Sequence, residues 1–169
     1  MKSKAFYVSF LSLSLAVGMI FSYVETLLPL NLIFPGFKLG LANAVALLLL
    51  RRFGFREALL VNIARILLSS LLFGNAMSLA FSLAGGITAL ILEWIMLKFS
   101  VFGILGVSSA GGAIHNLAQT VAAALILSTA GIMKLSPILL LLGGFTGILC
   151  GIVTYYAENL LRISGAFEK

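Results

Sequence analysis

The sequence predicts an all-α integral membrane protein, a single domain built as a bundle of six transmembrane helices. Of its 169 residues, 62% are hydrophobic and only 9% are charged. The mean hydropathy is +1.19. About a quarter of the residues in a soluble domain are charged, so this composition excludes a soluble protein. The few charges gather between long apolar runs, as is typical of the loops that join membrane spans.

Six apolar runs are the predicted spans. A helix crosses a bilayer with about 20 apolar residues, and the shorter second run is expected to be inclined or topped by a loop that dips back towards the protein. For the first run a cleaved signal peptide is the competing interpretation, because Ala16-Val17-Gly18 offers small residues to a peptidase. The spans are approximately residues 5–24, 36–50, 55–73, 77–97, 107–129 and 137–156.

The run from Phe99 to Met133 carries no charge over 35 residues, which is too long for one upright helix. Its first part, VFGILGVSSAGGA, is rich in glycine and serine. We therefore expect an interfacial or broken segment here, followed by the fifth span.

The basic residues predict an orientation, because cytoplasmic loops carry an excess of Lys and Arg. Two of the basic residues outside the spans, Lys38 and Lys134, fall on one side of the membrane and eight on the other. We expect a multi-pass protein of the cell (inner or plasma) membrane with both termini in the cytoplasm. The net charge of +6 suits anionic lipid headgroups better than nucleic acid. The eight inner residues are Lys2, Lys4, Arg51, Arg52, Arg56, Lys98, Arg162 and Lys169.

The reactive residues argue against an enzyme. Aspartate is absent, and all five acidic residues are glutamate. The single histidine and the single cysteine cannot build a zinc site, and magnesium–diphosphate chemistry lacks its usual carboxylate ligands. The glycines and Lys-Ser or Lys-Thr of a phosphate-binding loop are missing too. We expect no metal, no cofactor and no catalytic residues.

Small residues form stripes on two predicted spans, and such stripes let helices pack closely in lipid. Gly143, Gly147 and Gly151 recur every four residues on the sixth span. On the first span, one interpretation is packing within the chain and the other is docking of a partner membrane subunit. The stripe on the first span consists of Ser14, Gly18 and Ser22, with Ser12 and Ala16 beside it.

Polar residues inside the spans are candidate ligand contacts, because such residues are costly in lipid unless they serve packing or function. His115 and Gln119 share one face of the fifth span, with Asn116 beside them, and this group is the most specific candidate. Arg65 lies well inside the third span, where Glu93 of the fourth span is its expected partner. The remaining candidates are Asn43 in the second span and Glu25, Asn31, Lys38 and Asn75 at the outer ends of the spans.

Several sequence blocks carry a resemblance to a known family: PGFKLGLANAVALLLL, FGFREALLVNIARILLSSLLFG, SLAGG and GVSSAGGAIHNLAQ. Over roughly residues 20–150 the chain resembles the Gx transporter family, also labelled heptaprenyl diphosphate synthase component I. That family is similar to the substrate-binding S components of energy-coupling factor (ECF) transporters, six-helix proteins that capture a vitamin or related molecule near the outer surface. The resemblance implies a transmembrane coupling subunit and two cytoplasmic ATPases as partners. It places the contact with the coupling subunit at Ser12, Ser14, Ala16 and Gly18.

Three functions fit these observations. The first is a substrate-binding subunit of an ECF-type importer for a small organic nutrient, such as a vitamin or an isoprenoid or quinone precursor. The second is a membrane-embedded enzyme or accessory subunit acting on prenyl diphosphate or quinone lipids, for which Arg65 would suit a diphosphate. The third is a structural subunit of a membrane redox complex. An outward cavity lined by His115 and Gln119 would favour the first.

Overall fold

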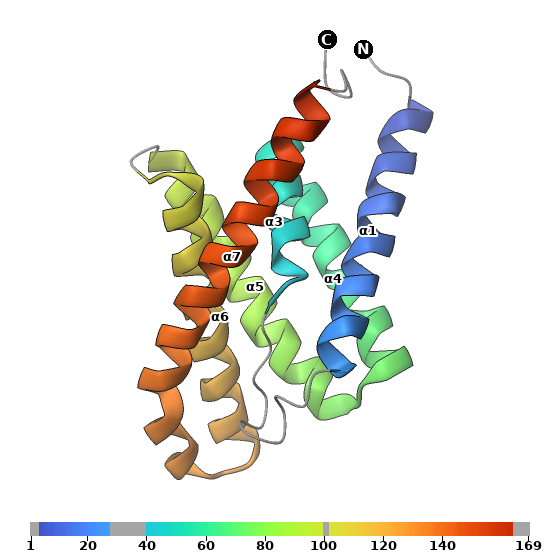
Figure 1. Cartoon of the computed structure of the whole chain (residues 1–169). Coiled ribbons are helices and arrows are strands. Elements are labelled where there is room, and N and C mark those ends of the chain that lie inside the picture. Colours follow the sequence, from blue (N-terminus) through green and yellow to red (C-terminus); the bar gives the residue numbers. More distant parts are fainter. Residues whose placement is uncertain (1–3, 28–39, 100–101, 164–169) are drawn as a thin grey trace.

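The structure, a computed structural model, describes residues 4–27, 40–99 and 102–163. In this part of the chain every regular element is a helix (Figure 1). The elements are α1 (Lys4–Leu27), α3 (Asn43–Arg52), α4 (Phe55–Phe73), α5 (Ala76–Phe99), α6 (Ile104–Ile126), a short 3-10 helix (Ala130–Leu135) and α7 (Ser136–Ile163).

The short helix α3 is the centre of the bundle. It contacts α1, α4, α5, α6 and α7, and the residues from Ala44 to Leu50 are buried except for Leu48. Around it, α1 packs against α4, α4 against α5, and α6 lies between α5 and α7 (Figure 1). Leu47 and Leu49 are completely buried in a core that includes Leu90 of α5 and Val107 of α6. With ten residues, α3 is too short to cross a bilayer by itself.

Helices α6 and α7 pack closely because glycines face each other across their contact. A Cβ atom on Gly112 would collide with the carbonyl oxygen of Gly143 and would lie 3.0 Å from the Cα of Gly147. The side chain of Ser109 on α6 donates a hydrogen bond of 3.0 Å to the carbonyl oxygen of Gly144 on α7. The stripe of small residues predicted on the sixth span is therefore a surface for packing within the chain.

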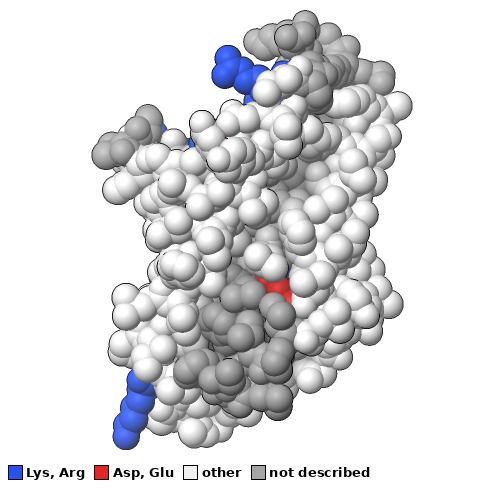
Figure 2. Space-filling view, in the orientation of Figure 1, with Lys and Arg blue, Asp and Glu red and all other residues white. Residues whose placement is uncertain are grey.

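The outer surface of the bundle is suited to lipid. Among the described residues, α1, α5 and the segment Ala130–Ile163 are long and apolar enough to cross a membrane. On the face seen in Figure 2, basic side chains lie at the ends of the molecule and a broad belt between them is almost free of charge. Several large apolar side chains are about two-thirds exposed or more, as is typical of surfaces that face lipid. Examples are Leu60, Leu71, Leu125, Leu141 and Leu160, which are 68–79% exposed.

The structure confirms the all-helical membrane fold, and the third predicted span coincides with α4. The exact number of six spans stays a prediction. Neither α4 nor α6 is among the apolar candidates for a span. Both helices carry polar groups on their inner faces, Arg65 on α4 and His115 on α6.

Two predicted helix starts are wrong. The fifth span was expected to begin at residue 107 after an interfacial or broken segment, but α6 already begins at Ile104, and its small residues serve the close contact with α7. The second span was expected to begin at residue 36, but Gly40 has a φ of 76° and α3 begins only at Asn43. Residues 36–39 lie outside the described part. At the ends, α1 continues to Leu27 and α7 to Ile163, beyond the predicted bounds.

The two described ends of the chain lie at the same end of the bundle (Figure 1), which we call the basic end. Contacts between helices fix this arrangement. The Tyr7 hydroxyl on α1 donates a hydrogen bond of 2.9 Å to Glu57 on α4, and Phe55 of α4 stacks on Trp94 of α5. The basic residues of this end are Lys4, Arg51, Arg52, Arg56, Lys98 and Arg162.

Candidate functional site

The first turn of α3 lies inside the bundle, and its backbone is the starting point of the site. Gly40 adopts the left-handed region, which glycine occupies without steric cost. Its carbonyl oxygen accepts a hydrogen bond of 2.8 Å from the backbone N–H of Asn43. The backbone N–H of the next residue, Leu41, donates to the Glu25 carboxylate of α1 at 2.6 Å. A carboxylate is stabilised at the N-terminus of a helix by the free N–H groups there. Glu25 is therefore a buried group that ties α1 to α3.

His115 of α6 joins Asn43 and Gln119 in one hydrogen-bonded chain. Its Nδ1 atom lies 3.3 Å from Asn43 Nδ2 and its Nε2 atom lies 2.9 Å from Gln119 Nε2. A neutral imidazole has one donor and one acceptor nitrogen, so the tautomer decides how the two carboxamides are turned. If Nδ1 accepts from Asn43, then Nε2–H donates to the oxygen of Gln119. If Nδ1–H donates instead, Nε2 accepts from the Gln119 NH₂ group.

Gln119 keeps one amide atom without a partner in either arrangement. As oriented in the structure, its Oε1 atom is buried and makes no hydrogen bond, and the residue is only 3% exposed. Gly85 of α5 makes room for this side chain, since a Cβ there would lie 2.7 Å from Gln119 Cγ. A buried amide atom without a partner is rare in folded proteins and marks a place for a further hydrogen-bonding group.

Arg65 of α4 is held by side chains of two helices. It donates hydrogen bonds to Ser22 of α1 at 3.0 Å and to Asn62 of its own helix at 2.7 Å. Asn62 in turn donates to the carbonyl oxygen of Gly86 on α5 at 3.2 Å. The carboxylate that interacts electrostatically with Arg65 is Glu25. Gly18 of α1 leaves space for the arginine chain, because a Cβ there would lie 3.0 Å from Arg65 Cδ.

These residues form one cluster, which we call the polar centre: Glu25, Asn43, Asn62, Arg65, His115 and Gln119. Four helices supply them. Two consecutive glycines of α5 lie against the cluster: Gly85 lies against His115 and Gln119, and Gly86 lies against Asn62. The expected pair between Arg65 and Glu93 does not form. Glu93 lies elsewhere, with its carboxyl group packed against α6 at Gly111.

Other candidates take positions outside the polar centre. Asn116 points to α7, where it donates a hydrogen bond of 3.1 Å to the Leu139 carbonyl oxygen. Asn75 is exposed and accepts a hydrogen bond of 2.8 Å from the Ser78 amide, which makes it the N-cap of α5. Asn31 and Lys38 lie outside the described residues.

The four candidates for partner contact on α1 divide between two faces of the helix. Ser14 and Gly18 are buried and face the other helices, whereas Ser12 and Ala16 are exposed. Residues two apart on a helix do not share a face, and this geometry explains the division.

The comparison with family models decides the identity of the family. The model described as heptaprenyl diphosphate synthase component I matches residues 14–157, most of the chain. The chain belongs to the heptaprenyl diphosphate synthase component I family, also called the Gx transporter family. The comparisons with curated proteins and with solved structures found no match.

A magnesium–diphosphate centre needs several carboxylates around one point. The described residues of this heptaprenyl diphosphate synthase component I family member do not form such a group. Of the described glutamates, Glu25 holds the start of α3, Glu57 accepts from Tyr7 and Glu158 pairs with arginines. No group of three or more His, Cys, Asp or Glu side chains within the described ranges is placed to hold a metal ion.

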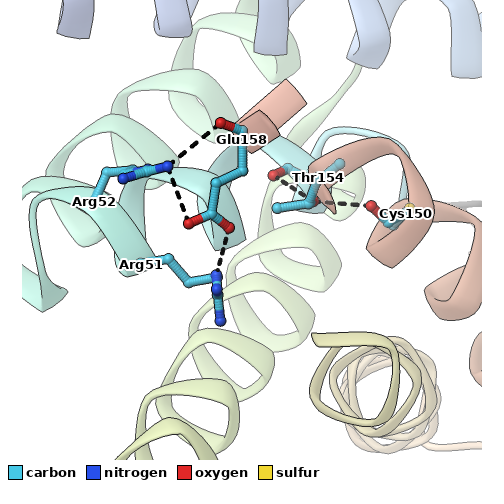
Figure 3. Close-up of polar contacts among 6 residues, drawn as sticks. Arg51, Arg52, Cys150, Thr154 and Glu158 are labelled. Atoms are coloured by element: carbon cyan, nitrogen blue, oxygen red, sulfur yellow. Dashed lines mark hydrogen bonds and ion pairs between the residues drawn. The ribbon is translucent and has the colours of Figure 1, made fainter. Parts of the chain in front are cut away.

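Two features of the heptaprenyl diphosphate synthase component I chain escaped the sequence reasoning. One is the attachment of α3 to α7: Cys150 donates a hydrogen bond of 3.3 Å to the Gly40 carbonyl oxygen, and Thr154 donates one of 3.1 Å to that of Ala44. Near the basic end, Arg51 and Arg52 both pair with Glu158 of α7, at 2.9 and 3.2 Å (Figure 3). The four-residue spacing of Cys150, Thr154 and Glu158 was a signal that they share a face.

The second feature is the isolation of Glu93, which is 3% exposed and pairs with no charged group in the described part of the chain. Burying a charge without a counter-charge is costly, so an uncharged group of the same shape is accommodated at least as well. We expect Glu93→Gln to keep or raise the thermal midpoint of unfolding, followed by the fluorescence of Trp94. Glu93→Lys, which introduces a longer side chain and a positive charge, is the destabilising control. A clear loss of stability in Glu93→Gln would show that the carboxylate has a partner.

Proposed function

We propose that the chain is the substrate-binding membrane subunit of an ECF-type importer and that it binds a small organic nutrient at the polar centre. The observation that carries the proposal is the convergence of buried polar side chains on the first turn of a half-length helix. Interrupted helices whose ends lie inside the membrane are typical binding sites of transporters, because their free backbone groups face the substrate. Polar groups are also costly within a bilayer unless they serve such a role.

In this proposal the ligand completes the hydrogen bonding of the His115 chain. The free amide atom of Gln119 takes one polar group of the ligand, and Asn43 and His115 hold Gln119 in place. Glu25 and Arg65 nearly compensate each other's charge, so the site suits an uncharged or partly apolar molecule. A vitamin or an isoprenoid or quinone precursor has this character.

Energy for import would come from other subunits, because the chain has no nucleotide-binding loop. We propose that a transmembrane coupling subunit docks on the exposed side of α1, where Ser12 and Ala16 lie, and that two ATPases bind it in the cytoplasm. Small exposed residues let a partner helix approach closely in lipid. The basic end faces the cytoplasm in this arrangement, in keeping with the positive-inside rule.

Native mass spectrometry of the protein purified in a mild detergent tests both parts. We expect a small molecule to remain bound to the wild type. The affinity for this molecule should fall about 5- to 30-fold in His115→Ala, because losing one buried hydrogen bond is worth about 1–2 kcal/mol. Asn75→Ala is the matched control, since Asn75 caps α5 away from the polar centre. Equal bound fractions in His115→Ala and the wild type, with unchanged thermal midpoints, would refute the site.

The partner is tested by co-purification. Ala16→Phe should abolish co-purification of the coupling subunit and leave the bound small molecule in place. Thr88→Phe, at an exposed position of α5, should change neither.

The printed description of the family favours a second candidate, an accessory subunit for prenyl diphosphate synthesis. It predicts a soluble synthase component in the co-purified material instead of a coupling subunit with ATPases. The same purification therefore separates the two functions.

A further inference from the structure

Helices α1 and α7 do not pack against each other, and an apolar groove separates them near the basic end. The groove has a volume of about 290 Å³, and all but one of its nine lining residues are apolar. Leu13 and Val17 line it from α1, Leu48 from α3, and Ala157 and Leu160 from α7.

The lining of the groove indicates what it holds. Ser14 is its one polar residue, and the Ser14 hydroxyl already donates a hydrogen bond of 2.8 Å to the Phe10 carbonyl oxygen of its own helix. The groove therefore offers an occupant mainly dispersion contacts with apolar side chains, which suits a hydrocarbon chain.

The charges at the mouth of the groove indicate the headgroup. Arg51 and Arg52 lie one helical turn beyond Leu48, on the side of the basic end. Figure 3 shows both guanidinium groups directed at the single carboxylate of Glu158, so these three groups together keep one positive charge. Arg162, which follows the groove on α7, is exposed and adds a second. An anionic headgroup complements this excess of positive charge.

We propose that the groove between α1 and α7 holds one acyl chain of an anionic phospholipid, whose phosphate lies against the arginines of the basic end. The lipid fills the space between the two helices that flank α3 and so keeps the bundle closed there. This inference goes beyond the importer function and does not depend on it, because it uses neither the polar centre nor a partner subunit.

Native mass spectrometry after delipidation tests the proposal, with phosphatidylglycerol and phosphatidylcholine of identical acyl chains added back. The wild type should retain phosphatidylglycerol at least fivefold better. Ala157→Phe fills the groove and should lower this retention at least fivefold. Thr88→Phe, which enlarges an exposed position of α5 away from the groove, should leave lipid retention unchanged. Arg162→Gln should lower the preference for phosphatidylglycerol and leave retention of phosphatidylcholine as it is.

Two further results keep the test decisive. If Ala157→Phe fails to fold, Leu13→Phe replaces it, because Leu13 is 63% exposed and its enlargement enters the groove without changing the core. Equal retention of the two lipids, or unchanged retention in both groove variants, would overturn the proposal. If a protein that co-purifies with the wild type is missing from Ala157→Phe while phosphatidylglycerol stays bound, the groove is assigned to that protein partner instead. Loss of the small molecule or of the coupling subunit in other variants would bear on the importer function alone.

Discussion

Arg65→Met is expected to lower the free energy of unfolding by about 3–5 kcal/mol, because it removes one member of a buried pair of charges and leaves the other uncompensated. Arg65 holds Ser22 and Asn62 through its two terminal nitrogens, and its charge acts on Glu25. Without the guanidinium group, Glu25 remains buried beside the first turn of α3, and the hydrogen bond from α4 to Ser22 of α1 is lost. The expected shift of the thermal midpoint is about 10 °C downwards for a chain of this length.

Arg56→Met is the matched control for this prediction. Arg56 lies on the same helix, is exposed, and should tolerate the substitution with little change in the thermal midpoint. The double variant Glu25→Gln/Arg65→Met should recover part of the lost stability, since it removes the charge that Arg65 compensates. An Arg65→Met protein as stable as the wild type would contradict the account of the polar centre, and a double variant no better than Arg65→Met would exclude the coupling to Glu25. Trp94, the single tryptophan, reports the transition in each case.

The helices could be predicted because their signal is local. An apolar run of sufficient length between charges indicates a span, and the third predicted span coincides with α4. The exceptions arise where small residues serve packing. The glycines and serines of VFGILGVSSAGGA indicated an interfacial or broken segment ahead of the fifth span, because glycine weakens an isolated helix. In the bundle, Gly111 and Gly112 lie within α6, where Gly111 leaves space for Glu93 and Gly112 faces α7.

The polar centre could be predicted only in part, for a geometric reason. His115 and Gln119 share a helical face, and their spacing identified them as a pair. The partner of Arg65 was misassigned, because depth along a helix says nothing about which neighbouring helix faces the side chain. Glu93 lies on the side of α5 that faces Gly111, whereas the charge that acts on the arginine is that of Glu25 on α1. Contacts between helices that are distant in the sequence have no local signal.

The same logic explains why α3 is placed so far inside. Its backbone begins in mid-bundle and needs partners for the groups of its first turn. Glu25 and Cys150 supply two of these partners, from α1 and from α7. Toward the basic end, the Glu158 pairs hold its last turn. A helix attached at both ends is a rigid platform for Asn43, which contacts His115. Substitutions that loosen α6 from α7 should therefore disturb the polar centre as well as the fold.

Gly112→Ala is expected to destabilise the bundle by about 1–3 kcal/mol or more, the usual range for overpacking a tight contact. The new methyl group would collide with the Gly143 carbonyl oxygen, a backbone atom that moves only if α6 and α7 separate. Alanine is also more favourable than glycine in a helix by about 1 kcal/mol, so the loss occurs against this intrinsic preference.

Gly144→Ala separates these two effects. A Cβ at Gly144 would lie 3.5 Å from Ser109 Oγ, an ordinary contact, and the thermal midpoint should stay the same or rise. If both variants behave alike, α6 and α7 do not approach as closely as their glycines indicate. If only Gly112→Ala loses stability and ligand binding together, the contact between α6 and α7 is what holds His115 and Gln119 at the first turn of α3.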